Sequence, residues 1–140
     1  MEWKEALPLL QENHTGVAIS VTPKGRAQST VVSTAVLDGK LGFASRPHTV
    51  KLKNIDRTGR ATVTVIKLDT RRYVTVEGPA SIEPWQDTPA HIKRLKDLYV
   101  AMGRGPKGDE EFARQMRDEE RSLVLVTPER LYGSLRSGGA

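Results

Sequence analysis

The 140-residue chain contains no cysteine, which excludes disulfides, thiolate nucleophiles and cysteine-ligated zinc or iron–sulfur centres. Its three histidines, His14, His48 and His91, are far apart in the sequence, and no two have the spacing of metal ligands on one helix face. The glycine-rich nucleotide-binding motifs and the nucleophile elbow of serine hydrolases are missing as well. Hydrolytic and metal-based chemistry therefore has little support, and a bound organic cofactor is the better enzyme hypothesis.

Long apolar runs are also missing, since no segment approaches the roughly 18 apolar residues of a membrane-spanning helix. Residues 1–14 are acidic and polar, whereas a signal peptide is basic and then apolar. We therefore expect no membrane partner and a cytoplasmic location. The length is close to the commonest size of one domain, and the only linker-like stretch is residues 137–140. Residues 1–140 are interpreted as a single domain.

Positive charge is what the chain has in excess, with a formal net charge of +5. This charge indicates an anionic partner or ligand, either a nucleic acid or a polyanionic small molecule. Aromatic residues make up only 5% of the chain, and no stretch interleaves aromatic and basic residues, so platforms for stacking bases are scarce. A small-molecule ligand is favoured, and no nucleic acid is expected.

Short segments with a two-residue period predict an antiparallel β-barrel or sandwich with small helices. The predicted strands are 15–21, 28–37, 40–45, 61–67, 73–82, 123–126 and 131–135, and the predicted helices are 2–13, 47–57, 89–102 and 109–120. Asp38-Gly39 is the strongest hairpin signal, because both central positions of a type I′ turn need a positive φ. Gly78-Pro79 predicts a bulge or bend. Pro8 is expected to shorten or kink the first helix.

The segment from Ala44 to Asn54 follows a predicted strand and opens a predicted helix. It brings together hydroxyl groups, cationic side chains and free backbone N–H groups. A helix amino terminus with nearby lysine and arginine side chains is a sound phosphate site. A basic, solvated helix explains the same pattern, and the residues alone leave both interpretations open.

The order of these segments resembles the flavin- and deazaflavin-binding split-barrel family related to pyridoxamine 5′-phosphate oxidase. The resemblance runs, in order, through Gly16 to Ala18, Gly25 to Ser29, Asp38 to Leu41, Lys51 to Arg57, Tyr73 to Ala80 and Val126 to Gly133. It implies a mainly β fold, a six- to seven-stranded antiparallel split barrel of the FMN-binding type with Greek-key topology. It also implies a homodimer with a cofactor at the interface.

The resemblance further implies which residues bind that cofactor. Those implied are Gln28, Ser29, Thr30, Val31, Val32 and Ser33 along the ring, Ala44, Ser45 and Arg46 beside the ribityl chain, Thr49, Lys51 and Asn54 around the phosphate, and Arg71 and Arg72 from the other subunit. Lys51 is expected to neutralise the phosphate. Tyr73, also from the other subunit, is a candidate proton donor. An ordinary solvated turn is the less favoured alternative explanation for Arg71 and Arg72.

Charge guides the choice of cofactor. FMN carries one phosphate, whereas coenzyme F420 carries a phosphodiester and an acidic oligoglutamate tail. The basic residues expected around one groove are Arg26, Arg46, Lys51, Lys53, Arg71 and Arg72. They favour the longer polyanion. The expected function is that of an F420-dependent oxidoreductase, which transfers hydride between the reduced deazaflavin and a small unsaturated organic substrate. An FMN-binding oxidoreductase of the same fold and a non-catalytic flavin or F420 carrier are the alternatives.

Overall fold

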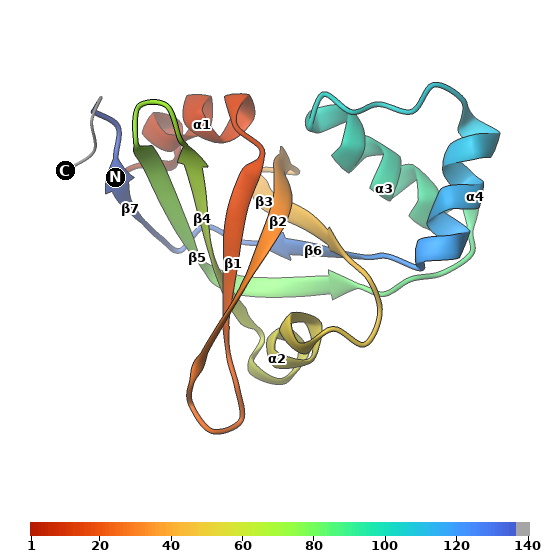
Figure 1. Ribbon diagram of the computed structural model, residues 1–140, viewed down its shortest axis with the longest axis horizontal. Coiled ribbons are helices and arrows are strands. Elements are labelled where there is room, and N and C mark those ends of the chain that lie inside the picture. Colours follow the sequence, from red (N-terminus) through yellow and green to blue (C-terminus); the bar gives the residue numbers. More distant parts are fainter. Residues whose placement is uncertain (137–140) are drawn as a thin grey trace.

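The computed structural model describes residues 1–136, which form seven strands and four helices (Figure 1). In chain order the elements are α1 (Trp3–Glu12), β1 (Thr15–Val21), β2 (Ala27–Leu37), β3 (Lys40–Ser45), α2 (Val50–Thr58), β4 (Arg60–Lys67), β5 (Arg72–Glu83), α3 (Pro89–Ala101), α4 (Asp109–Glu119), β6 (Ser122–Val126) and β7 (Arg130–Ser134). The predicted linker-like stretch, residues 137–140, lies outside the described residues.

Six antiparallel strands close into a barrel in the order β4–β1–β2–β3–β6–β5, and β5 pairs back to β4. The first four strands have the spatial order 4-1-2-3, which is that of a Greek key. β7 is an additional strand on the outer side of β5. The predicted antiparallel split barrel is therefore confirmed.

β5 joins two sheets because it changes partners at Gly78-Pro79. Residues up to Pro79 pair with β4, and the residues from Ala80 to Glu83 pair with β6. A Cβ at position 78 would collide with the Thr127 carbonyl oxygen, so only glycine allows this close approach. The predicted bend coincides with the change of partner.

Local turn chemistry also agrees with the sequence. Asp38 and Gly39 have φ values of 56° and 70°, and they connect the paired residues Leu37 and Lys40. The predicted type I′ hairpin is thus confirmed. Pro8 does not end the first helix, which continues through it, because the buried residues of α1 hold the helix while the proline ring faces solvent.

The barrel separates two hydrophobic cores. Inside it, α1 contributes Leu10 and α2 contributes Ile55, so helices cover both ends of the barrel (Figure 1). On its outer face, α3 and α4 pack against β2, β3 and β6. β6 is buried on both sides, because Val124 faces the barrel interior while Leu123 and Leu125 face the helices. This explains its continuous apolar sequence.

No helix within residues 1–136 is both long enough and apolar enough to cross a membrane.

Candidate functional site

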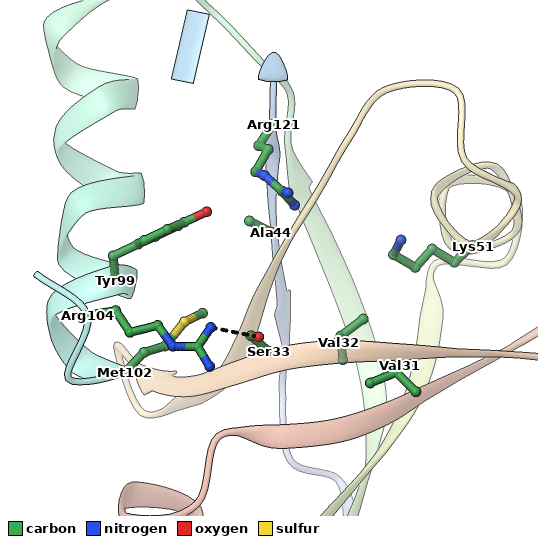
Figure 2. Close-up of a pocket in the computed structure, with 9 residues that line it drawn as sticks. All are labelled: Val31, Val32, Ser33, Ala44, Lys51, Tyr99, Met102, Arg104 and Arg121. Atoms are coloured by element: carbon green, nitrogen blue, oxygen red, sulfur yellow. Dashed lines mark hydrogen bonds between the residues drawn. The ribbon is translucent and has the colours of Figure 1, made fainter. Parts of the chain in front are cut away.

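A pocket of about 280 Å³ opens where the barrel meets α2, α3 and the loop after α3 (Figure 2). Its lining residues are Val31, Val32, Ser33, Ala44, Lys51, Tyr99, Met102, Arg104 and Arg121. The first five of these are among the cofactor-binding residues predicted from the sequence. The last four are not.

The segment that leads into α2 is held by its own hydroxyl groups. Thr49 caps the helix, and its Oγ1 accepts a hydrogen bond from the Leu52 backbone N–H at 3.4 Å. Ser45 is fully buried, and its Oγ lies 2.9 Å from Thr49 Oγ1 and 3.0 Å from the Arg46 carbonyl oxygen. The two predicted hydroxyl residues therefore shape the helix entry, and the first turn carries Lys51 toward the pocket.

Lys51 and Arg121 extend into the pocket from different sides, one from α2 and the other from the start of β6 (Figure 2). Partial burial, and next the positive charge of Arg121, lower the pKa of Lys51. Two cations held this close repel each other unless an anion lies between them. The arrangement therefore favours a bound anion, and phosphate and carboxylate groups are the anions that lysine and arginine side chains commonly bind.

The backbone of Arg121 is fixed by a buried histidine. His91 donates a hydrogen bond from Nε2 to the Arg121 carbonyl oxygen at 2.9 Å. Its ring lies edge-on to Trp85, with 5.4 Å between the ring centroids. His91 thus has a structural role and lies away from the pocket lining. Among the described residues, no group of three potential ligands is placed to hold a metal ion.

Arg46 is placed beside the pocket rather than in its lining. It is largely exposed and pairs with Glu119 at the end of α4, at 3.5 Å. Glu119 also accepts a hydrogen bond from Arg121 Nε at 2.8 Å. One carboxylate therefore joins the loop before α2 to an arginine of the pocket.

The opposite wall is built by α3 and the residues after it. Tyr99 points into the pocket and packs edge-on against Phe112 of α4, with a centroid distance of 5.3 Å. Burial raises the pKa of its phenol. α3 then ends in a Schellman motif, in which the Arg104 N–H bonds to the Tyr99 carbonyl and Gly103 has a φ of 74°. This turn directs Arg104 over β2, where its Nη1 donates to Ser33 Oγ at 3.2 Å.

The sequence contained only weak signals for these four additional lining residues. Tyr99 and Met102 lie on the apolar face of the predicted helix 89–102, and that pattern does not distinguish a core residue from a pocket residue. Arg104 belongs to a glycine-rich loop, and Arg121 follows two glutamates. Only the packing of α3 and α4 against β2, β3 and β6 brings them to the site.

Several predicted residues lie outside the lining of this pocket in the same protomer. They are Gln28, Ser29 and Thr30 in the first half of β2, Ser45, Arg46 and Thr49 ahead of α2, Asn54 in α2, and Arg71, Arg72 and Tyr73 at the β4–β5 hairpin. Asn54 is buried, its Nδ2 donates to Ser20 Oγ at 3.1 Å, and its Oδ1 accepts from Arg57 at 3.0 Å. Both ends of its amide are therefore used within the fold.

The predicted basic residues do not all gather around the pocket of one protomer. Lys53 lies in a different hollow, beside Trp85. Arg26 is in the β1–β2 turn, and Arg72 lies against α1. Of the six cations expected around one groove, Lys51 lines the pocket and Arg46 lies next to it.

The barrel topology defines a split-barrel protein, and a cationic pocket lies beside the first turn of α2. The family comparison agrees, because residues 3–134 match the pyridoxamine 5′-phosphate oxidase family. The chain belongs to this family. Members of the family have a flavin-binding fold, and they include oxidoreductases.

Solved structures share the fold at low sequence identity. A conserved hypothetical protein from Mycobacterium tuberculosis has a TM-score of 0.75 and 23% identity, over 96% of this chain and 84% of that one. An F420 reductase has a TM-score of 0.66 and 24% identity, over 89% and 94%. A pyridoxamine 5′-phosphate oxidase-related, FMN-binding protein from Nostoc punctiforme has a TM-score of 0.67 and 17% identity, over 94% and 83%. No curated protein sequence matches significantly.

Proposed function

We propose that this protein is an F420-dependent oxidoreductase that transfers hydride between the reduced deazaflavin and a small unsaturated organic substrate. The convergence of Lys51 and Arg121 on one pocket is the observation that supports it best. Burial, and next the charge of Arg121, lower the pKa of Lys51. In this proposal the two side chains hold the phosphate of the cofactor. The net charge of +5 favours the polyanionic F420 over FMN.

The remaining lining residues have distinct proposed roles. Val31 and Val32 offer an apolar surface to the ring, and Ala44 leaves room beside the ribityl chain. Burial raises the pKa of Tyr99, so its phenol stays neutral and can donate a hydrogen bond to the bound substrate. Arg104 orients an electron-rich group of the bound cofactor or substrate near Ser33. The cofactor itself supplies the hydride chemistry.

A homodimer that completes the site is part of the proposal. The pocket of about 280 Å³ falls just below the usual range of ligand pockets, roughly 300–1,000 Å³. Val31 is 72% exposed at its edge, which leaves apolar surface for a ring or a second protomer to cover. Arg71 and Tyr73 lie on a hairpin outside the pocket of their own protomer and remain proposed contributions to the other site. The cytoplasmic location stays a prediction.

Two alternatives remain within the same fold. The first is an FMN-binding oxidoreductase, and the FMN-binding Nostoc protein shares this fold at 17% identity. The pairing of Arg46 with Glu119 also favours it, because it reduces the free positive charge available to a long acidic tail. The second is a carrier of flavin or F420 without turnover. A hydride-transfer assay with reduced F420 and unsaturated acceptors distinguishes a carrier from an enzyme.

Cofactor titrations test the proposal directly. F420 and FMN are each titrated into the wild-type protein, Lys51→Ala and Lys53→Ala, with calorimetry or tryptophan fluorescence as the readout. Both lysines lie on α2, but Lys53 faces a different hollow and serves as the matched control. We expect F420 to bind more tightly than FMN, and Lys51→Ala to weaken binding at least tenfold, about 1.4 kcal/mol, while Lys53→Ala changes it little.

The outcomes separate the hypotheses. Equal losses in the two lysine variants would refute a phosphate site at Lys51. Binding of FMN alone would replace the F420 proposal with the first alternative. If neither cofactor binds, the proposed function is refuted, and the assignment of the fold is unaffected.

A further inference from the structure

Within residues 1–136, Glu119 is the one carboxylate that contacts cations at or beside the pocket, and these cations are Arg46 and Arg121. Its Oε1 lies 3.5 Å from Arg46 Nη2, and its Oε2 accepts from Arg121 Nε at 2.8 Å. Gln115 Nε2 donates to Oε1 at 3.2 Å. Three donors therefore surround a side chain that is only 15% exposed.

The position of Glu119 in its helix is electrostatically unfavourable. It is the last residue of α4, where the helix dipole is negative and a cation is preferred. Hydrogen bonds from Arg121 and Gln115 nevertheless keep the pKa of the carboxyl below its ordinary value, although burial acts in the opposite direction. The two arginines thus compensate for the dipole, and the carboxylate is held ionised beside a site that favours anions.

Glu119 contacts only part of each arginine. It engages Arg121 through Nε, so the terminal nitrogens Nη1 and Nη2 of that guanidinium remain directed toward the pocket. Lys51, Arg104, Arg121 and Arg46 supply four positive charges, and Glu119 subtracts one. The carboxylate therefore orients Arg121 and, at the same time, reduces the net charge that a ligand meets.

We propose that Glu119 is an internal counterion that competes with the phosphate of the ligand for Arg46 and Arg121 and so sets how tightly the site binds an anion. This inference rests on the phosphate role proposed above for Lys51 and Arg121. It assigns Glu119 as a specificity-determining residue that keeps the affinity for phosphate-bearing ligands moderate. Glu119 should not affect the affinity for ligands that lack a phosphate.

The test compares ligands that differ only in the phosphate. FMN and riboflavin are titrated into the wild-type protein and Glu119→Gln, whose amide oxygen still accepts from Arg121 Nε. We expect removal of the negative charge that contacts Arg121 to tighten FMN binding roughly tenfold, a difference of about 1.4 kcal/mol. Riboflavin binding stays within about twofold. Asp118→Asn is the matched control, because Asp118 is exposed on the same helix and the substitution changes the net charge equally.

A second experiment adds inorganic phosphate and measures how far it raises the melting temperature of each protein. We expect a larger increase in Glu119→Gln and in Glu119→Ala than in the wild type or Asp118→Asn. Failure of the wild type to bind any cofactor would refute the proposed function, while this comparison would still test Glu119. Equal phosphate responses in all four proteins, or tighter binding of FMN and riboflavin alike, would overturn the inference. So would loss of the fold in both neutral variants, since Glu119 would then only anchor α4.

Discussion

Asn54 is a test of whether the α2 segment supports the fold or binds the cofactor, because the sequence predicted that Asn54 contacts the cofactor. In the structure it is 2% exposed and joins α2 to β1 through its hydrogen bond to Ser20, which is itself 3% exposed. Its other end accepts from Arg57, which also donates to the Val21 carbonyl oxygen. We predict that Asn54→Ala destabilises the fold and leaves the intrinsic cofactor affinity of the folded protein nearly unchanged.

The magnitude follows from what the substitution leaves behind. Ser20 Oγ remains buried without its donor, which costs about 1–3 kcal/mol. The contact to Arg57 lies near the surface and adds little. A total loss of about 2 kcal/mol is therefore expected. Asp56→Ala, at an exposed position of the same helix, should change stability by less than about 0.5 kcal/mol.

The assay is urea unfolding without ligand, followed by FMN and F420 titration of each folded variant. A shift in the denaturation midpoint without a change in its slope measures the loss of stability. The reasoning would be refuted if Asn54→Ala kept wild-type stability but lost cofactor affinity at least tenfold. Asn54 would then face the ligand in the bound state, as the sequence motif implied.

Two further predictions concern the barrel and its outer helix. Gly78→Ala should lower the free energy of unfolding in urea by about 3 kcal/mol, because the new Cβ would meet the Thr127 carbonyl oxygen. Gly59 has a left-handed backbone but open space around it, so Gly59→Ala should lower the free energy by only about 1 kcal/mol. Equal losses in the two variants would contradict this prediction. The hydrogen bond from Arg94 lowers the pKa of Glu83 in the folded protein. The pair therefore stabilises the fold fully above the pKa of Glu83 in the unfolded chain, near 4.5, and the stabilisation is lost as the pH falls through the lower pKa of the folded state. Glu83→Gln should thus lose about 0.5–1 kcal/mol at pH 7 and less below pH 4.5, and a pH-independent loss would refute the pairing.

Local signals explain why the fold was predictable. The Asp38-Gly39 turn fixes the β2–β3 hairpin through two positive φ values, and this requirement is visible in the sequence itself. The apolar alternation of β1 and β4 fixes which face of each strand is buried. Even the change of partner in β5 is marked by Gly78-Pro79. Each of these features depends on a few neighbouring residues.

The site was less predictable, because it depends on contacts between distant segments. Ser33 and Arg104 are 71 residues apart, yet they form one hydrogen bond at the pocket. Arg121 reaches Lys51 only because β6 pairs with β3. Asn54 lies three residues after Lys51, but the helix turns its side chain into the core. A motif along the chain does not reveal such directions.

The pocket combines an element of the barrel with an element outside it, and this division bears on specificity. Lys51 and the Thr49 cap belong to the segment between β3 and β4, whose position follows from closure of the barrel. Tyr99 and Arg104 belong to α3 and the turn after it, which pack on the outer face and can change without disturbing the barrel strands. If the proposed function holds, the barrel side fixes where the anionic group of the cofactor binds, and the helical side selects the ring or substrate next to it. Differences in substrate among proteins of this fold should accordingly correlate with α3 and α4 rather than with the strands.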